Sequence, residues 1–208
     1  MNIILVRHGE SVNNLPGAVW APDPDLTPQG LAQARLLGER CRALSIDAIL
    51  CSPTLRTLRT ANEISVRKNN MPVQILHELA EVGTDYPIRG HARALEACPA
   101  ALPYEDVPAG NYGDAYELAI KDPHYLQSRA CRVISRARQV YARDASVVLV
   151  GHVGINQYLL AAALWMPRPG FKFAQGNACM NIIEYSDGED GREATRLVTV
   201  NDTEHLRG

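Results

Sequence analysis

Short apolar runs alternate with longer helical patterns along most of the chain. Four runs have the length and continuity of strands buried on both faces of a sheet, at residues 2–6, 47–51, 73–76 and 146–150. One helical pattern covers residues 155–164. Three others begin where a capping residue precedes a proline, at Thr27-Pro28, Ser52-Pro53 and Asp122-Pro123. This alternation predicts an α/β fold with a mainly parallel sheet.

Two parts of the chain depart from the alternation. Residues 82–121 are rich in Pro, Gly, Ala and Tyr and lack a clear period, so we expect an insertion over the active-site end of the sheet. Residues 178–185 and 195–200 resemble strands and flank Asp187-Gly188, which predicts an antiparallel hairpin at a sheet edge near the C-terminus. The predicted architecture is therefore one three-layer α/β/α domain over residues 1–208, with a central mainly parallel sheet.

The composition is that of an ordinary globular protein. The 208 residues are 46% hydrophobic and 21% charged, and the formal net charge is -2. This balance gives no global attraction to nucleic acid or to an anionic membrane. No apolar run approaches the ~20 residues that a membrane-spanning helix needs. We therefore expect neither partner, and any anion site must come from a local cluster.

Cysteine usage and the first residues predict a cytoplasmic protein. The chain has five cysteines, an odd number without a close pair: Cys41, Cys51, Cys98, Cys131 and Cys179. We expect neither a disulfide framework nor a zinc site, and free thiols suit a reducing compartment. The apolar start, Met1 to Val6, is followed rather than preceded by positive charge, unlike an export signal.

Histidine and arginine follow three of the predicted strands. Arg7 and His8 come directly after the first strand, Arg56 follows the second, and His152 follows the strand at 146–150. In parallel sheets the ligand crevice lies off the carboxyl ends of the strands. Guanidinium groups hold phosphate oxygens in bidentate fashion, and imidazole changes charge near neutral pH. Each residue alone is more often a solvated or structural side chain, but together they predict an anion site.

The same positions carry a resemblance to a known family. The segment Leu5-Val6-Arg7-His8-Gly9-Glu10-Ser11 resembles the opening signature of the histidine phosphatase superfamily, which includes the cofactor-dependent phosphoglycerate mutases. Four later blocks are similar to that family in the same order: Asp25 to Gly30, Ser52 to Arg56, Val148 to His152, and Asn177. The similarity spans nearly the whole chain apart from the insertion.

The resemblance implies metal-independent hydrolysis of phosphate monoesters through a phosphohistidine. His8 would be the nucleophile, and Arg7, Asn14, Arg56 and His152 would hold the phosphoryl oxygens. The cationic side chains would supply the charge, so no metal ion or cofactor is expected, and the partner would be a small phosphate ester.

The same resemblance implies a general acid in a Leu-x-Glu pattern after the strand at 73–76. Two such patterns occur, ending at Glu78 and Glu81. The family's usual spacing from strand to acid favours Glu81, and Glu78 is the alternative. One departure from the family is nearby, since Val153 rather than glycine follows His152, and Gly154 comes next.

Two other functions stay open. Phosphoglycerate mutases carry adjacent arginines in the insertion, whereas here Arg89 and Arg93 stand apart among apolar and acidic residues. A phosphatase is therefore preferred to a mutase. A non-catalytic module that binds phosphorylated ligands is a third reading, against which the full set of site residues argues. The edge hairpin leaves open whether the protein is a homodimer.

Overall fold

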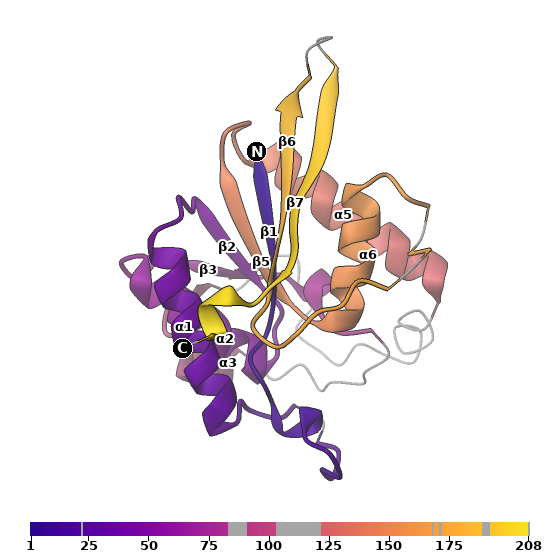
Figure 1. Ribbon diagram of the computed structural model, residues 1–208. Helices are drawn as coiled ribbons and strands as arrows, with labels where there is room; N and C mark the ends of the chain where they lie inside the picture. Colours follow the sequence, from indigo (N-terminus) through magenta and orange to yellow (C-terminus); the bar gives the residue numbers. More distant parts are fainter. Residues whose placement is uncertain are drawn as a thin grey trace.

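The fold is built on a seven-stranded mixed sheet (Figure 1). The computed structural model describes residues 1–21, 23–82, 91–102, 122–167, 169–170, 172–188 and 192–207. The strands are β1 (Asn2–Arg7), β2 (Ala48–Cys51), β3 (Val73–Ile75), β4 (Ala101–Leu102), β5 (Ser146–Gly151), β6 (Met180–Asp187) and β7 (Glu193–Asp202). Their order is β4-β3-β2-β5-β1-β6-β7. The first five in this order are parallel, and β6 and β7 are antiparallel to their neighbours, which confirms the predicted fold class.

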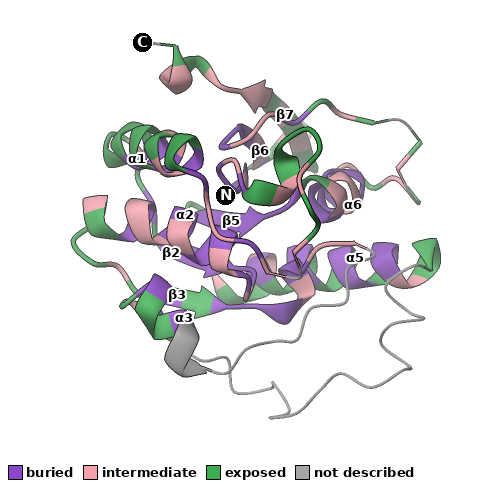
Figure 2. Ribbon diagram, turned by 90° about the horizontal axis from the view of Figure 1, so that it is seen from below, coloured by how far each residue is buried: buried purple, intermediate pink, exposed green. Residues whose placement is uncertain are grey.

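Helices cover both faces of the sheet. They are α1 (Pro28–Arg42), α2 (Leu55–Arg67), α3 (His91–Ala97), α5 (Pro123–Val140) and α6 (Val153–Ala163), with short 3-10 helices η1 (Val12–Asn14), η2 (His77–Leu79) and η3 (Glu204–Leu206). Alternate strand residues feed two apolar cores. Ile4 and Val6 pack toward α1, α2 and α3, whereas Ile3 and Leu5 pack toward α5 and α6. Figure 2 shows the buried strands between these helical layers.

Two of the predicted helix starts are confirmed by their caps. The Thr27 hydroxyl accepts from the Gly30 N–H at 3.0 Å, and the Asp122 carboxylate accepts from the His124 N–H at 2.9 Å. The helix expected at Ser52-Pro53 instead begins at Leu55, with Thr54 in the capping position. That prediction was wrong because the Ser52 hydroxyl contacts a distant histidine rather than the helix.

The predicted insertion contains regular structure where the sequence lacks a clear period. Helix α3 packs on α2, and β4 adds a parallel strand beside β3. Residues 83–90 and 103–121 of the insertion, with its four tyrosines, lie outside the described residues. Whether the insertion covers the active site therefore stays a prediction.

The predicted hairpin is present and lies at the edge of the sheet. Strands β6 and β7 pair antiparallel from Met180↔Asp202 to Asp187↔Glu193. In Figure 1 the strands β6 and β7 extend beyond the rest of the sheet at the end opposite to the one where β1 leads into η1. Within the described ranges, no helix has the length and apolar character to span a membrane.

Candidate active site

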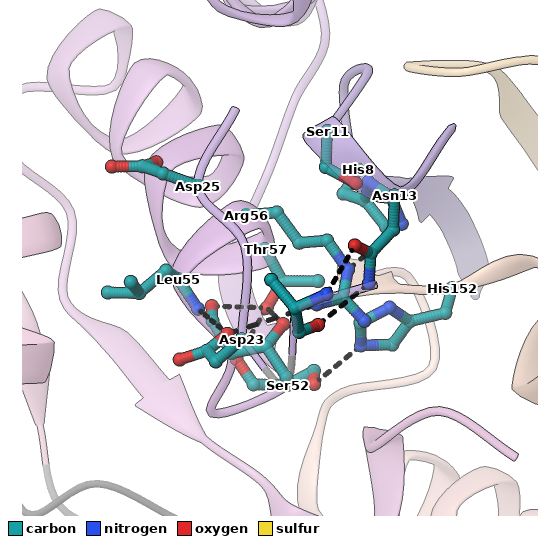
Figure 3. Close-up of polar contacts among 12 residues, drawn as sticks. His8, Ser11, Asn13, Asp23, Asp25, Ser52, Leu55, Arg56, Thr57 and His152 are labelled. Carbon is teal, nitrogen blue, oxygen red and sulfur yellow. Dashed lines mark hydrogen bonds and ion pairs between the residues drawn. The ribbon is translucent and has the colours of Figure 1, made fainter. Parts of the chain in front are cut away.

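Three parallel strands bring their following residues to one place. In the sheet Arg7 pairs with Gly151, and Cys51 pairs with Val150, so β1, β2 and β5 end almost level. His8 and His152 therefore leave the sheet side by side, with ring centroids 5.1 Å apart and ring planes at 65°. Figure 3 shows Arg56 reaching from the start of α2 toward these two histidines. The strand-end residues expected from the sequence thus meet.

His8 is held in one tautomer. Its Nδ1 lies 2.6 Å from the Gly9 carbonyl oxygen, and because a carbonyl only accepts, Nδ1 carries the proton. The lone pair is then on Nε2, which accepts from Arg56 Nε at 3.3 Å. Burial, and then the positive charges of Arg56 and Arg7, lower the pKa of His8 well below its ordinary 6.5. A neutral imidazole with its lone pair in a cationic pocket suits nucleophilic attack.

The backbone after β1 is fixed by close contact with α1 and α2. The Gly9 N–H donates to the Thr60 hydroxyl at 3.1 Å. A Cβ on Gly9 would collide with the Gly30 carbonyl, and a Cβ on Gly30 would collide with the backbone of Glu10. These two segments, which are separate in the sequence, can approach only because both carry glycine. The contact restrains the backbone of Gly9, the residue next to His8.

Arg7 and Arg56 are each oriented by a partner that the motifs did not indicate. The Arg7 Nη1 donates to the Gln175 carbonyl at 2.6 Å. Arg56 Nη1 lies 3.8 Å from the Asp23 carboxylate, and both side chains are about 95% buried. The same Asp23 oxygen accepts the Leu55 N–H at 2.9 Å, so it caps α2 while it pairs with Arg56. The sequence offered no signal for Asp23 beyond its place in a polar, proline-containing loop.

His152 is fully buried at the capping position of α6. Its Nε2 lies 2.8 Å from the Ser52 hydroxyl, and its Nδ1 has no hydrogen-bond partner among the described residues. Burial, and then the charges of Arg56, His8, Arg7 and Arg129, lower the pKa of His152 well below 6.5. The Ser52 contact fixes the ring and leaves Nδ1 as the nitrogen that can meet a ligand oxygen.

The Glu81 carboxylate lies at the first turn of α6, directly after His152. Oε1 accepts from the N–H groups of Val82 at 2.8 Å and Ile155 at 3.1 Å, and Oε2 accepts from Gly154 at 3.2 Å. A Cβ on Gly154 would overlap the Glu81 carboxylate, so any larger residue there would displace the carboxylate from this position. The glycine displaced by one position from the family pattern thus makes room for the predicted acid. Glu78 lies in η2 and is half-buried.

Asn14 lies beside the loop that carries His8. Its Oδ1 accepts from the Ser11 N–H at 2.9 Å, the Ser11 hydroxyl at 3.1 Å and Asn177 Nδ2 at 3.1 Å. Asn177 also donates to the His8 carbonyl at 3.4 Å. With its oxygen engaged, the Asn14 amide presents N–H donors, which suits the predicted contact with a phosphoryl oxygen.

Three buried amides lie behind Arg7, and sequence reasoning missed them. Gln175 Oε1 accepts from Asn156 at 3.1 Å and from Asn181 at 3.4 Å. Asn181 also donates to the Leu5 carbonyl, which ties β6 to β1. The residues come from α6, β6 and the segment between them, so no local spacing could have indicated their meeting.

The assembled site can bind a tetrahedral dianion and present it to a nucleophile. Two guanidinium groups and the His152 ring surround His8 Nε2. Cations placed where phosphoryl charge develops stabilise the transition state, and a water-poor pocket strengthens that effect.

Comparisons with known proteins show the family and the fold. Residues 3–203 match the model of the histidine phosphatase superfamily, branch 1. Phosphoserine phosphatase 1 of Hydrogenobacter thermophilus is 43% identical over 70 residues, which is 33% of each protein. A Schizosaccharomyces pombe protein named as a phosphatase is 40% identical over 213 residues, covering 99% of this chain and 71% of that protein. An Entamoeba histolytica phosphoserine phosphatase, crystallised as a variant with phosphoserine, has the same fold, with TM-score 0.66, 22% identity and coverage of 99% and 98%.

Proposed function

Because the chain belongs to the histidine phosphatase superfamily, we propose that it hydrolyses phosphate monoesters without a metal ion, through a phosphohistidine on His8. The observation that carries the proposal is the state of His8. Its Nδ1 proton is directed to Gly9 O, and its basic Nε2 faces Arg56. Named phosphatases among the relatives support the same reaction class.

In the first step His8 Nε2 attacks phosphorus. The N–P bond forms as the ester P–O bond breaks opposite to it. Arg7, Arg56 and His152 stabilise the three equatorial oxygens, and Asn14 adds an amide donor. His152 meets the phosphoryl group through Nδ1, because Ser52 occupies its Nε2.

Glu81 serves both steps as the proton carrier. As a carboxylic acid it protonates the leaving alkoxide. As a carboxylate it then takes a proton from water, whose oxygen attacks phosphorus and breaks the N–P bond to give inorganic phosphate. We choose Glu81 over Glu78 because its carboxylate accepts from the N–H groups of Gly154 and Ile155, two and three residues after His152.

The test is hydrolysis of phosphoserine and p-nitrophenyl phosphate in excess chelator, with wild type, His8→Ala and Glu78→Gln. We expect wild-type activity to survive the chelator, His8→Ala to lose it by at least about 10³-fold, and Glu78→Gln to retain it. Protein labelled with 32P and quenched in alkali, where the N–P bond of a phosphohistidine survives, would identify the intermediate if the label is absent from His8→Ala. Equal activity of His8→Ala and wild type would refute the nucleophile.

The same preparation separates the other two functions. Interconversion of 2- and 3-phosphoglycerate, dependent on a bisphosphoglycerate primer and faster than phosphate release, would indicate a mutase. Saturable phosphate binding without turnover of any monoester would indicate a binding module. Either result would replace the proposed hydrolysis.

We also propose that the protein works in a reducing compartment such as the cytoplasm. All five cysteines are free in the structure, and four of them are buried. Free buried thiols are typical of proteins that meet no oxidising machinery.

A further inference from the structure

Arg129 is the largest side chain that the described residues bury completely. It lies on α5 among apolar neighbours on the same helical face, Leu126, Ala130 and Val133. Moving a cation from water into such surroundings costs several kcal/mol unless charge and hydrogen bonds compensate. An arginine exposed to solvent on the same helix would not carry this desolvation cost. We therefore expect the buried Arg129 guanidinium to matter for the chain segment that it contacts.

The Arg129 side chain contacts the chain segment that carries the predicted acid. Arg129 Nη2 donates to the Ala80 carbonyl at 2.8 Å. That carbonyl belongs to the peptide that joins Ala80 to Glu81, so the bond restrains the backbone immediately before the carboxyl-bearing residue. Helix α5 also packs against both η2 and α6, the elements on either side of Glu81.

Glu81 is thus held from two sides by different helices. On the backbone side, α5 restrains the Ala80–Glu81 peptide through Arg129. On the side-chain side, α6 restrains the carboxylate through the Gly154 and Ile155 N–H groups. Because the same turn of α6 begins at His152, both restraints relate the Glu81 carboxyl to the phosphoryl site. The Arg129 charge also acts on His152.

We propose that Arg129 is a positioning residue for acid catalysis, which holds Glu81 at the start of α6 where it can protonate the leaving oxygen. This proposal rests on the proposed function. Arg129 acts in this role through the backbone carbonyl of Ala80. Its loss would shift the carboxyl, and a displacement near 1 Å costs on the order of 10²-fold in rate.

Two substrates with different leaving groups distinguish a loss of acid catalysis from a general loss of active structure. The serine of phosphoserine would leave as an alkoxide and needs a proton from the general acid, whereas the p-nitrophenolate of p-nitrophenyl phosphate leaves without one. The quantity compared is kcat/KM, which covers the steps up to formation of the phosphoenzyme and excludes its hydrolysis. For Arg129→Met we expect kcat/KM to fall about 10- to 100-fold for phosphoserine and less than about threefold for p-nitrophenyl phosphate.

Three further variants make the comparison specific. Arg132→Met removes an exposed arginine from the same helix and should leave both values unchanged. Arg129→Lys keeps the charge and one donor and should recover part of the phosphoserine activity. In Glu81→Gln the acid is already absent, so adding Arg129→Met should cost little more, because two residues in one unit are not additive.

A second readout does not depend on activity. Amide hydrogen exchange at Gly154 and Ile155 reports the Glu81 cap, so Arg129→Met should accelerate it as much as Glu81→Ala does, while amides in the middle of α6 stay protected. If wild type hydrolysed no monoester, the proposed function would fail while this exchange would still test the positioning. Equal losses for both substrates, or unchanged exchange at the two amides, would overturn the proposal. If Arg129→Met does not fold, Arg129→Lys carries the same two measurements.

Discussion

Gly154→Ala is a one-methyl test of how the predicted acid is seated. The added Cβ would overlap Glu81 Oε1 and lie 3.1 Å from Val82 Cβ, closer than carbon atoms normally pack. The helix backbone of α6 is the stiffer partner, so the flexible carboxylate moves, by roughly 1 Å if ordinary contact is to be restored. A displacement of that size in a catalytic group lowers the rate by on the order of 10²-fold.

Stability should change much less than activity in this variant. Alanine gains up to about 1 kcal/mol over glycine in a helix. Weakening the hydrogen bonds at the start of α6 costs a similar amount, about 1 kcal/mol. The two effects nearly cancel, so the urea midpoint should stay close to that of wild type. Loss of activity without loss of stability would locate the effect in the site.

The assay is kcat/KM for phosphoserine and for p-nitrophenyl phosphate, with Gly170→Ala as the matched control. At Gly170 the contact that an added Cβ would make among the described residues is with Met166 at 3.6 Å, an ordinary distance. We expect Gly154→Ala to lose phosphoserine hydrolysis selectively. Full phosphoserine activity in Gly154→Ala would show that the Glu81 carboxyl is not placed as described, and the reasoning would fail.

Three other outcomes follow from burial and charge. Since the unfolded chain protonates His8 and His152 near pH 6.5 and the folded chain only at lower pH, stability should fall as pH drops from about 7 to about 5, and less so in His152→Ala. Asp23→Ala removes the buried carboxylate paired with Arg56 and should cost about 3–5 kcal/mol in urea unfolding; Asp23→Asn, which keeps an acceptor for the Leu55 N–H, should cost less. Dithionitrobenzoate should titrate Cys131 alone in the folded protein and all five thiols in urea, since burial protects the others.

Each of these outcomes has a contrary result. A flat stability profile between about pH 7 and about pH 5 would mean that the two imidazoles are not buried in the neutral form. Equal destabilisation by Asp23→Asn and Asp23→Ala would assign the effect to the charge rather than to the cap. Rapid reaction of several thiols in the folded protein would contradict the burial of the cysteines.

The strand-end residues were predictable because their placement follows from local pattern. A continuous apolar run identifies a strand buried on both faces, and parallel strands end at one edge. Arg7, His8 and His152 directly follow such runs, and Arg56 is the second residue of the helix that follows the run at 47–51. Their meeting needed only the strand order, which chain direction and short connections restrict.

The start of α2 shows where local pattern was not enough. Ser52-Pro53 has the form of a cap followed by proline, but Ser52 contacts His152, a hundred residues away. Thr54 takes the capping position, but its hydroxyl contacts the Thr57 hydroxyl and caps no helix N–H, and Asp23 accepts the Leu55 N–H from outside the helix. A tertiary contact outweighed a capping preference worth about 1 kcal/mol.

The sequence by itself determined six of the seven strands, most helices, the family and the four cationic or imidazole residues, because these depend on residue type and on spacing within one element. Two Leu-x-Glu patterns left the acid undecided between Glu78 and Glu81, and the one-domain organisation stays a prediction. The tertiary structure alone brought Glu81 to the start of α6, Gln175 to Arg7 and Arg129 beneath Ala80. Those contacts join segments from different elements, and the hydrogen bonds that define them exist only after the helices have packed on the sheet.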